Sequence, residues 1–148
     1  MPGGSSFYAR RFAHETLMHR ADATLALGRD FTADQAVALD ALDEWMTLGT
    51  LPHVLEVHPE QRELLGPGRT IHLHATDAAP GTEAEWLVDL TGDTIAWRRA
   101  DEKAAVAVRG PLTELLLLVY GRRPAAEDLE ILGDRDLLDF WLARTSFG

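Results

Sequence analysis

Two residues near the start of the chain, Glu15 and His19, have the spacing of a metal-binding pair on a helix. Residues four apart lie on one helix face, one turn apart, so a carboxylate and an imidazole there can bind one ion. Catalytic zinc normally has three protein ligands and a water, so this pair alone leaves zinc under-ligated. His14 points about a hundred degrees away and is a poor third ligand. The alternative is an exposed pair on a solvated helix.

A second candidate is the pair His72 and His74, in a segment where apolar and polar residues alternate. Residues two apart project from the same face of a strand, so both imidazoles could bind one metal ion. The alternative is a polar stripe that faces solvent or a covering helix. His53 and His58 lie in a predicted linker and give no functional signal. The chain has no cysteine, which excludes Cys-ligated zinc, a Cys nucleophile and a disulfide framework.

Arg109 and Arg122 end predicted elements in the second half of the chain. A guanidinium forms two parallel hydrogen bonds with a carboxylate, so either residue could bind a carboxylate substrate. For Arg122 the alternative is a cation that offsets the macrodipole at the end of a helix. The apolar run 115–119 could line a ligand cavity, or it is the buried face of a helix on a sheet.

The charge of the chain limits its partners. The 148 residues carry a net charge of −10 with a pI near 4.9. Such an acidic surface repels phosphate backbones and anionic lipid headgroups, so we expect neither nucleic acid nor a membrane as partner. The N-terminal residues contain no apolar segment of the signal-peptide type, and the longest apolar run is too short to span a bilayer. We therefore expect a cytoplasmic protein.

The first third of the chain has helical periodicity. Apolar residues recur at helical spacing over residues 7–27, and Gly28 provides a stop. Thr32 is predicted to cap a second helix that runs to Leu48. Residues 49–68 form a linker with some helical content, which ends at two glycines and a proline. We assign residues 1–48 to a helical segment.

Residues 69–148 have a different character and predict an α+β domain. Period-two alternation and turn residues predict strands at residues 70–77, 85–90, 94–99, 104–109 and 129–132. Pro111 starts one helix and Asp134 caps another. The expected fold is an antiparallel sheet covered by two helices.

Several segments, taken in order, resemble the mycothiol-dependent maleylpyruvate isomerase family. Residues 9–22 are similar to the last helix of that family's metal-binding bundle. Residues 71–77 with Glu85 and Trp86 resemble the first hairpin of its C-terminal domain. Residues 108–117, 120–122 and 132–137 resemble the rest of that domain.

The resemblance implies a DinB-like four-helix bundle followed by a domain similar to sterol carrier proteins. It also implies zinc or another divalent metal, mycothiol as thiol cofactor, and a small carboxylate substrate. Glu15 and His19 match the Glu-x-x-x-His ligand pair, and Arg122 is the best match for an active-site arginine. The chain departs from the family in one respect, because the earlier helices and the first His ligand have no counterpart.

Two alternative functions follow from this resemblance. The chain is either a truncated, metal-dependent and thiol-using isomerase or transferase, or a non-catalytic module that binds a small molecule or assembles with other proteins. For the first, a homodimer or a partner chain would have to supply the missing helices.

Overall fold

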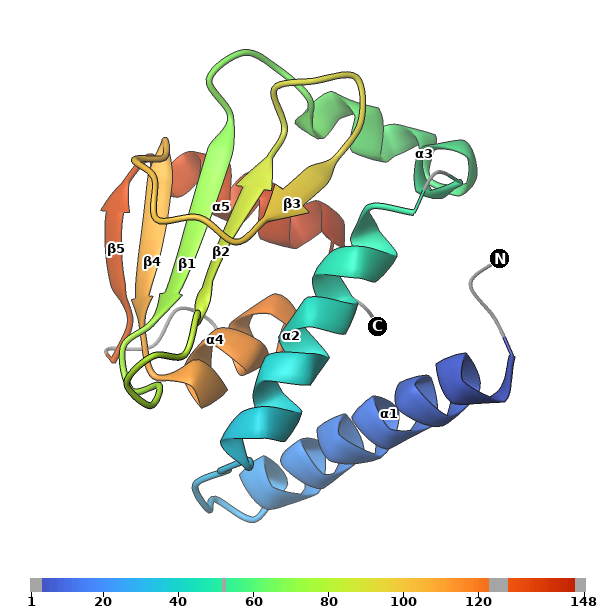
Figure 1. The fold of residues 1–148 in the computed structure, drawn as a ribbon, viewed down its shortest axis with the longest axis vertical. Coiled ribbons are helices and arrows are strands. Elements are labelled where there is room, and N and C mark those ends of the chain that lie inside the picture. Colours follow the sequence, from blue (N-terminus) through green and yellow to red (C-terminus); the bar gives the residue numbers. More distant parts are fainter. Residues whose placement is uncertain (1–3, 52, 123–127, 146–148) are drawn as a thin grey trace. The chain divides into compact units, whose positions relative to one another are not determined.

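The computed structural model describes residues 4–51, 53–122 and 128–145, and the chain divides into two compact units, residues 1–34 and 35–148. The first unit contains one long helix, α1 (Ser5–Ala26) (Figure 1). Gly28 ends it with a positive φ of 70°, and the amide of Arg29 bonds back to the carbonyl oxygen of Thr24 at 3.1 Å. This is a glycine C-cap, so the predicted stop is confirmed. Among the described residues, no helix is both long and apolar enough to cross a membrane.

The second unit contains the remaining helices. They are α2 (Gln35–Gly49), α3 (Val54–Val57), the 3₁₀ helix η1 (Pro59–Leu64), α4 (Leu112–Val119) and α5 (Arg135–Thr145). The predicted cap of α5 is confirmed, because the Oδ1 of Asp134 accepts a hydrogen bond from the amide of Leu137 at 3.1 Å. Thr32 was predicted to cap α2, but that helix begins three residues later, at Gln35. The second unit thus includes α2, which the sequence analysis had grouped with the N-terminal helix.

A five-stranded sheet forms the centre of the second unit, with strand order β3-β2-β1-β4-β5. The strands are β1 (Thr70–Ala75), β2 (Glu85–Asp89), β3 (Ala96–Arg98), β4 (Val106–Gly110) and β5 (Glu130–Gly133). The α+β class is confirmed. The sheet is mixed rather than wholly antiparallel, because β1 and β4 pair in parallel while the other neighbours are antiparallel.

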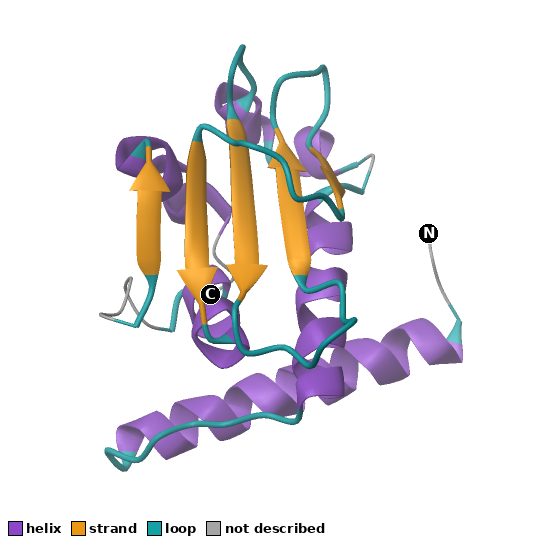
Figure 2. Cartoon of the chain, turned by 60° about the vertical axis from the view of Figure 1, so that its left-hand side comes forward, coloured by secondary structure: helices purple, strands orange, loops and turns teal. Residues whose placement is uncertain are grey.

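The parallel pair results from the connection between β3 and β4. After the β1–β2–β3 meander, residues 99–105 cross the sheet on the face opposite α4 and α5, so that β4 starts at the same end as β1 (Figures 1 and 2). The end of this crossover segment is fixed at Ala105, whose amide donates to the Oγ1 of Thr70 at 3.0 Å. Its carbonyl oxygen accepts from the amide of Asp134 at 2.8 Å.

The two faces of the sheet differ in character. On the helix side, alternate residues of the three central strands are buried: Ile71, Leu73, Trp86, Val88, Val106 and Val108. The apolar run of α4 is buried with them, which confirms its alternative reading as the face of a helix on a sheet. The other face presents His72 and His74 toward the crossover segment.

One carboxylate joins α2 to the sheet. Asp43 accepts a hydrogen bond at Oδ1 from the indole nitrogen of the fully buried Trp86, at 2.8 Å. Both of its oxygens also lie 2.6 Å from the Nη2 of Arg99, at the start of the crossover segment. Asp43 therefore holds together a helix, a strand and a loop.

Candidate functional site

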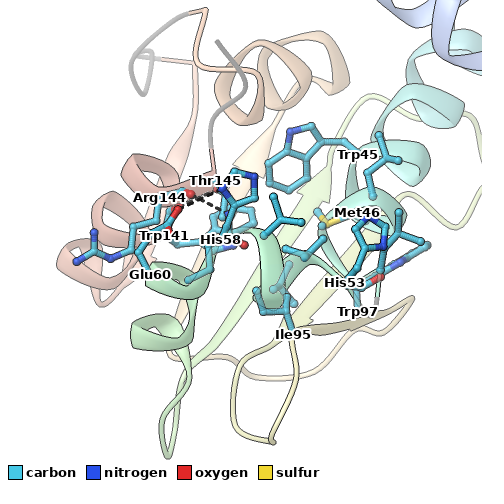
Figure 3. A pocket seen from close by; sticks show the side chains of 18 residues that line it. Trp45, Met46, His53, His58, Glu60, Ile95, Trp97, Trp141, Arg144 and Thr145 are labelled. Atoms are coloured by element: carbon cyan, nitrogen blue, oxygen red, sulfur yellow. Dashed lines mark hydrogen bonds and ion pairs between the residues drawn. The ribbon is translucent and has the colours of Figure 1, made fainter. Parts of the chain in front are cut away.

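A cavity of about 510 Å³ lies on the helix side of the sheet, within the second unit. It is enclosed by α2, the α3–η1 segment, the β2–β3 hairpin and α5, as Figure 3 shows from close by. Its walls are mainly apolar and include Trp45, Met46, Val54, Ile95, Trp97 and Trp141. This size falls in the range of pockets that take small organic ligands, about 300–1,000 Å³.

Two tryptophans pack against each other in one wall of this cavity. Trp45 of α2 and Trp141 of α5 meet edge to face, with ring centroids 5.3 Å apart and an interplanar angle of 82°. Both are buried, with 4% and 1% of their surface exposed. Buried rings packed in this way give the cavity a continuous apolar wall, which suits a small organic ligand.

The charged side chains around the cavity have partners, and the polar residues that line it are Thr50, His53, His58, Glu60, Gln61, Arg144 and Thr145. The Nη2 of Arg144 lies 2.6 Å from the Oε2 of Glu63, and its guanidinium stacks 4.3 Å from the ring centre of Phe140. The Nδ1 of His58 lies 3.2 Å from the Oε1 of Glu60. Glu63 thus offsets the charge of Arg144, and the cavity favours an apolar ligand over a charged one.

The predicted histidine pair lies on the other face of the sheet. His74 is directly opposite Glu85 in the β1–β2 register. The Oε1 of Glu85 is 3.5 Å from the Nδ1 of His74 and 3.3 Å from the Nε2 of His72. His72 is buried and His74 is half-buried, and both line a pocket with residues 101–104 of the crossover segment rather than with a covering helix.

Glu15 and His19 are both exposed on α1, and Glu15 forms an ion pair with Arg11. Among the described residues, the structure brings together one group of three potential metal ligands, His72, Glu85 and Asp101. Neither Glu15 nor His19 belongs to it. Arg122 follows α4, and its Nη1 donates to the carbonyl oxygen of Tyr120 at 3.0 Å. This is the geometry expected of a cation at a helix end.

Sequence reasoning missed three features. The cavity tryptophans have the pattern of ordinary core residues, and His53 was set aside although it lines the cavity. Glu85 could have been found from the hairpin register, which places it beside His74. Asp101 gave no signal, because its proximity to His72 depends on the path of the crossover segment.

Comparison with known proteins agrees with this fold. Residues 9–140 match the family model described as the MDMPI C-terminal domain, which confirms the resemblance found in the sequence. No curated protein matches the sequence. Among solved structures, the sterol carrier protein domain 2 of Helicoverpa armigera is similar with a TM-score of 0.55 and 12% identity, over 79% of this chain and 95% of that one. The sec-alkylsulfatase Pisa1 from Pseudomonas sp. has a TM-score of 0.50 and 13% identity, over 78% of this chain but only 17% of the enzyme. These similarities show a shared fold.

Proposed function

The chain belongs to the MDMPI C-terminal domain family, and we propose that it is a binding module for a small, largely apolar molecule. The observation that supports this proposal is the cavity lined by Trp45, Trp97 and Trp141. A preformed apolar pocket with a few polar groups is the usual form of a small-molecule site. The name of one fold neighbour, a sterol carrier protein, is in keeping with an apolar ligand.

The charge around the cavity suggests an uncharged ligand. The cation at its edge, Arg144, is paired with Glu63 at 2.6 Å through Nη2, so a carboxylate at its remaining buried donor, Nε, would place a second negative charge beside Glu63. The chain as a whole has a net charge of −10, which repels anions further. A neutral molecule with a flat or chain-like apolar body is repelled neither by Glu63 nor by the net charge of the chain.

A series of straight-chain alcohols tests this proposal. Each methylene that enters the cavity contributes about 0.8 kcal/mol, which corresponds to roughly fourfold in affinity. Affinity measured by calorimetry should therefore rise about fourfold per carbon until the cavity is full, and then level off. Decanol should bind more tightly than decanoate, because only the carboxylate of decanoate is repelled by Glu63 at the edge of the cavity.

A matched pair of variants locates the binding. Val54→Trp places a large ring on the cavity wall and should abolish binding of decanol. Val37→Trp adds the same ring to an exposed position of α2 that does not line the cavity, and should leave binding unchanged. Binding that survives Val54→Trp, or that does not depend on chain length, would contradict the proposal.

The isomerase activity after which the family is named is the second candidate, favoured by the family match alone. It would need a metal at Glu15 and His19, with Arg122 binding the substrate carboxylate and mycothiol as the thiol. The donors present do not fit a zinc site by themselves, since they number two and Glu15 is engaged by Arg11. Zinc that is lost in both Glu15→Ala and His19→Ala would favour this candidate, with a second chain completing the site.

A further inference from the structure

We infer that the face of the sheet opposite the helices holds a divalent transition-metal site, with His72, Glu85 and Asp101 as ligands. Each offers one ligand atom, and these atoms all lie within 4.8 Å of one another. The residues come from β1, β2 and the crossover segment, so the site exists only in the folded unit. It is separate from the apolar cavity, and it shares no residue with Glu15 and His19.

The spacing of the first two ligands already suits zinc. Zinc binds imidazole nitrogen and carboxylate oxygen at about 2.0–2.2 Å in tetrahedral geometry, which places neighbouring ligand atoms about 3.4 Å apart. The Nε2 of His72 and the Oε1 of Glu85 are 3.3 Å apart. Both residues lie in paired strands, which fix their backbones. Asp101 lies in the crossover segment, which has no strand pairing of its own and can close the remaining distance.

Each strand ligand also has one buried atom without a hydrogen-bond partner, although Glu85 as a whole is half-buried. His72 has only 6% of its surface exposed. Its Nε2 and the Oε1 of Glu85 are both inaccessible to solvent, and their contact is not aligned as a hydrogen bond. Leaving a buried polar atom unsatisfied is costly, so such atoms in a folded protein call for a ligand or an ion. A cation between them would satisfy both.

The charges nearby explain why carboxylates are needed. Lys103 and Arg109 line an open pocket of about 530 Å³ together with His72, Asp101 and Glu102, and their positive charges oppose a bound cation. Glu85 and Asp101 supply two negative charges that offset this repulsion. His74 lies beside the group, 3.5 Å from Glu85, and is near enough to support the site. Three protein ligands leave a fourth position for water, as in catalytic zinc sites.

Zinc binding to the untagged full chain, freed of metal with a chelator, tests the site. Calorimetry should show one zinc per chain, and cobalt in its place should give the intense visible absorption of tetrahedral coordination. Asp101→Asn should weaken zinc binding at least about tenfold, because it removes a ligand from the exposed loop without disturbing the buried strands. Glu85→Gln should have at least the same effect.

Two controls make the result specific. Glu102→Gln changes the neighbouring carboxylate, which lines the same pocket but pairs with Arg98 at 2.9 Å and is not a ligand, so it should weaken zinc binding far less than Asp101→Asn does. The double variant Glu15→Ala/His19→Ala should also bind zinc normally. No zinc binding, or binding that is lost in the double variant and kept in Asp101→Asn, would overturn the inference.

Discussion

Replacement of Asp43 by alanine should destabilise the second unit far more than replacement of its charged partner, Arg99. Asp43 accepts hydrogen bonds from the indole of Trp86 and from the guanidinium of Arg99. Asp43→Ala removes the acceptor for both donors, whereas Arg99→Ala removes the ion pair, a hydrogen bond to the carbonyl oxygen of Glu83 and a contact with the Trp86 ring, and leaves the Trp86–Asp43 bond in place. Comparing the two variants therefore separates the buried hydrogen bond from the surface electrostatics.

The magnitudes follow from the exposure of each partner. Trp86 is fully buried, so its unpaired indole N–H would cost about 1–3 kcal/mol. The side chains of Arg99 and Asp43 are 32% and 27% exposed, so their ion pair contributes about 0.5 kcal/mol. We expect Asp43→Ala to lower the free energy of unfolding by about 2–3 kcal/mol and Arg99→Ala by less than about 1 kcal/mol.

Urea denaturation followed by circular dichroism measures both effects. The midpoint should fall in Asp43→Ala with an unchanged dependence on urea concentration, since the buried area stays the same. If Asp43→Ala is no more destabilising than Arg99→Ala, the buried bond to Trp86 is not the main contribution of Asp43. The account of how α2 is held on the sheet would then be wrong.

Two further perturbations test the backbone and the charge at strand ends. Gly133→Ala should lower the free energy of unfolding by more than about 2 kcal/mol, because φ is +99° and an added Cβ would collide with the carbonyl oxygen of Ala105. Gly68→Ala, with a φ of +74° and open space around it, should cost only about 1 kcal/mol by the same urea titration; equal costs would refute the collision. Hydrogen bonds from the hydroxyl and then the amide of Thr91 lower the pKa of Asp89 in the folded chain below its ordinary value of 3.8. The ionised carboxylate therefore stabilises the fold above pH 3.8, and this stabilisation is lost as the pH falls through the pKa of the folded state. Between about pH 5 and about pH 3, Asp89→Asn should therefore lose less stability than the parent chain, and parallel pH profiles would contradict this assignment.

Much of the fold could be predicted because its signals are local. The alternation around His72 and His74 marked β1, and the glycine after α1 and the aspartate before α5 marked helix ends. The parallel pairing of β1 with β4 could not be predicted in this way. It depends on the path of residues 99–105 across the sheet, and nothing in the composition of that segment specifies a crossover.

The candidate sites were less accessible from sequence for a related reason. A hydrophobic pattern shows that Trp45 and Trp141 are buried, but it does not show that space remains between them and the β2–β3 hairpin. Likewise, spacing can place two histidines on one strand face, but it cannot bring Asp101 to them from a loop. Glu15 and His19 had the clearest spacing, and as a metal pair they remain a prediction.

The central claim, that the cavity binds an apolar molecule, is tested most directly by the indole N–H signals of the four tryptophans in a ¹⁵N-labelled chain. Trp45, Trp97 and Trp141 line the cavity, whereas Trp86 is buried outside it and serves as an internal control. On titration with decanol, the first three signals should shift together along one saturable binding curve while that of Trp86 stays in place. If none of the three moves, or if all four move equally, the ligand does not occupy this cavity and the proposed function is wrong.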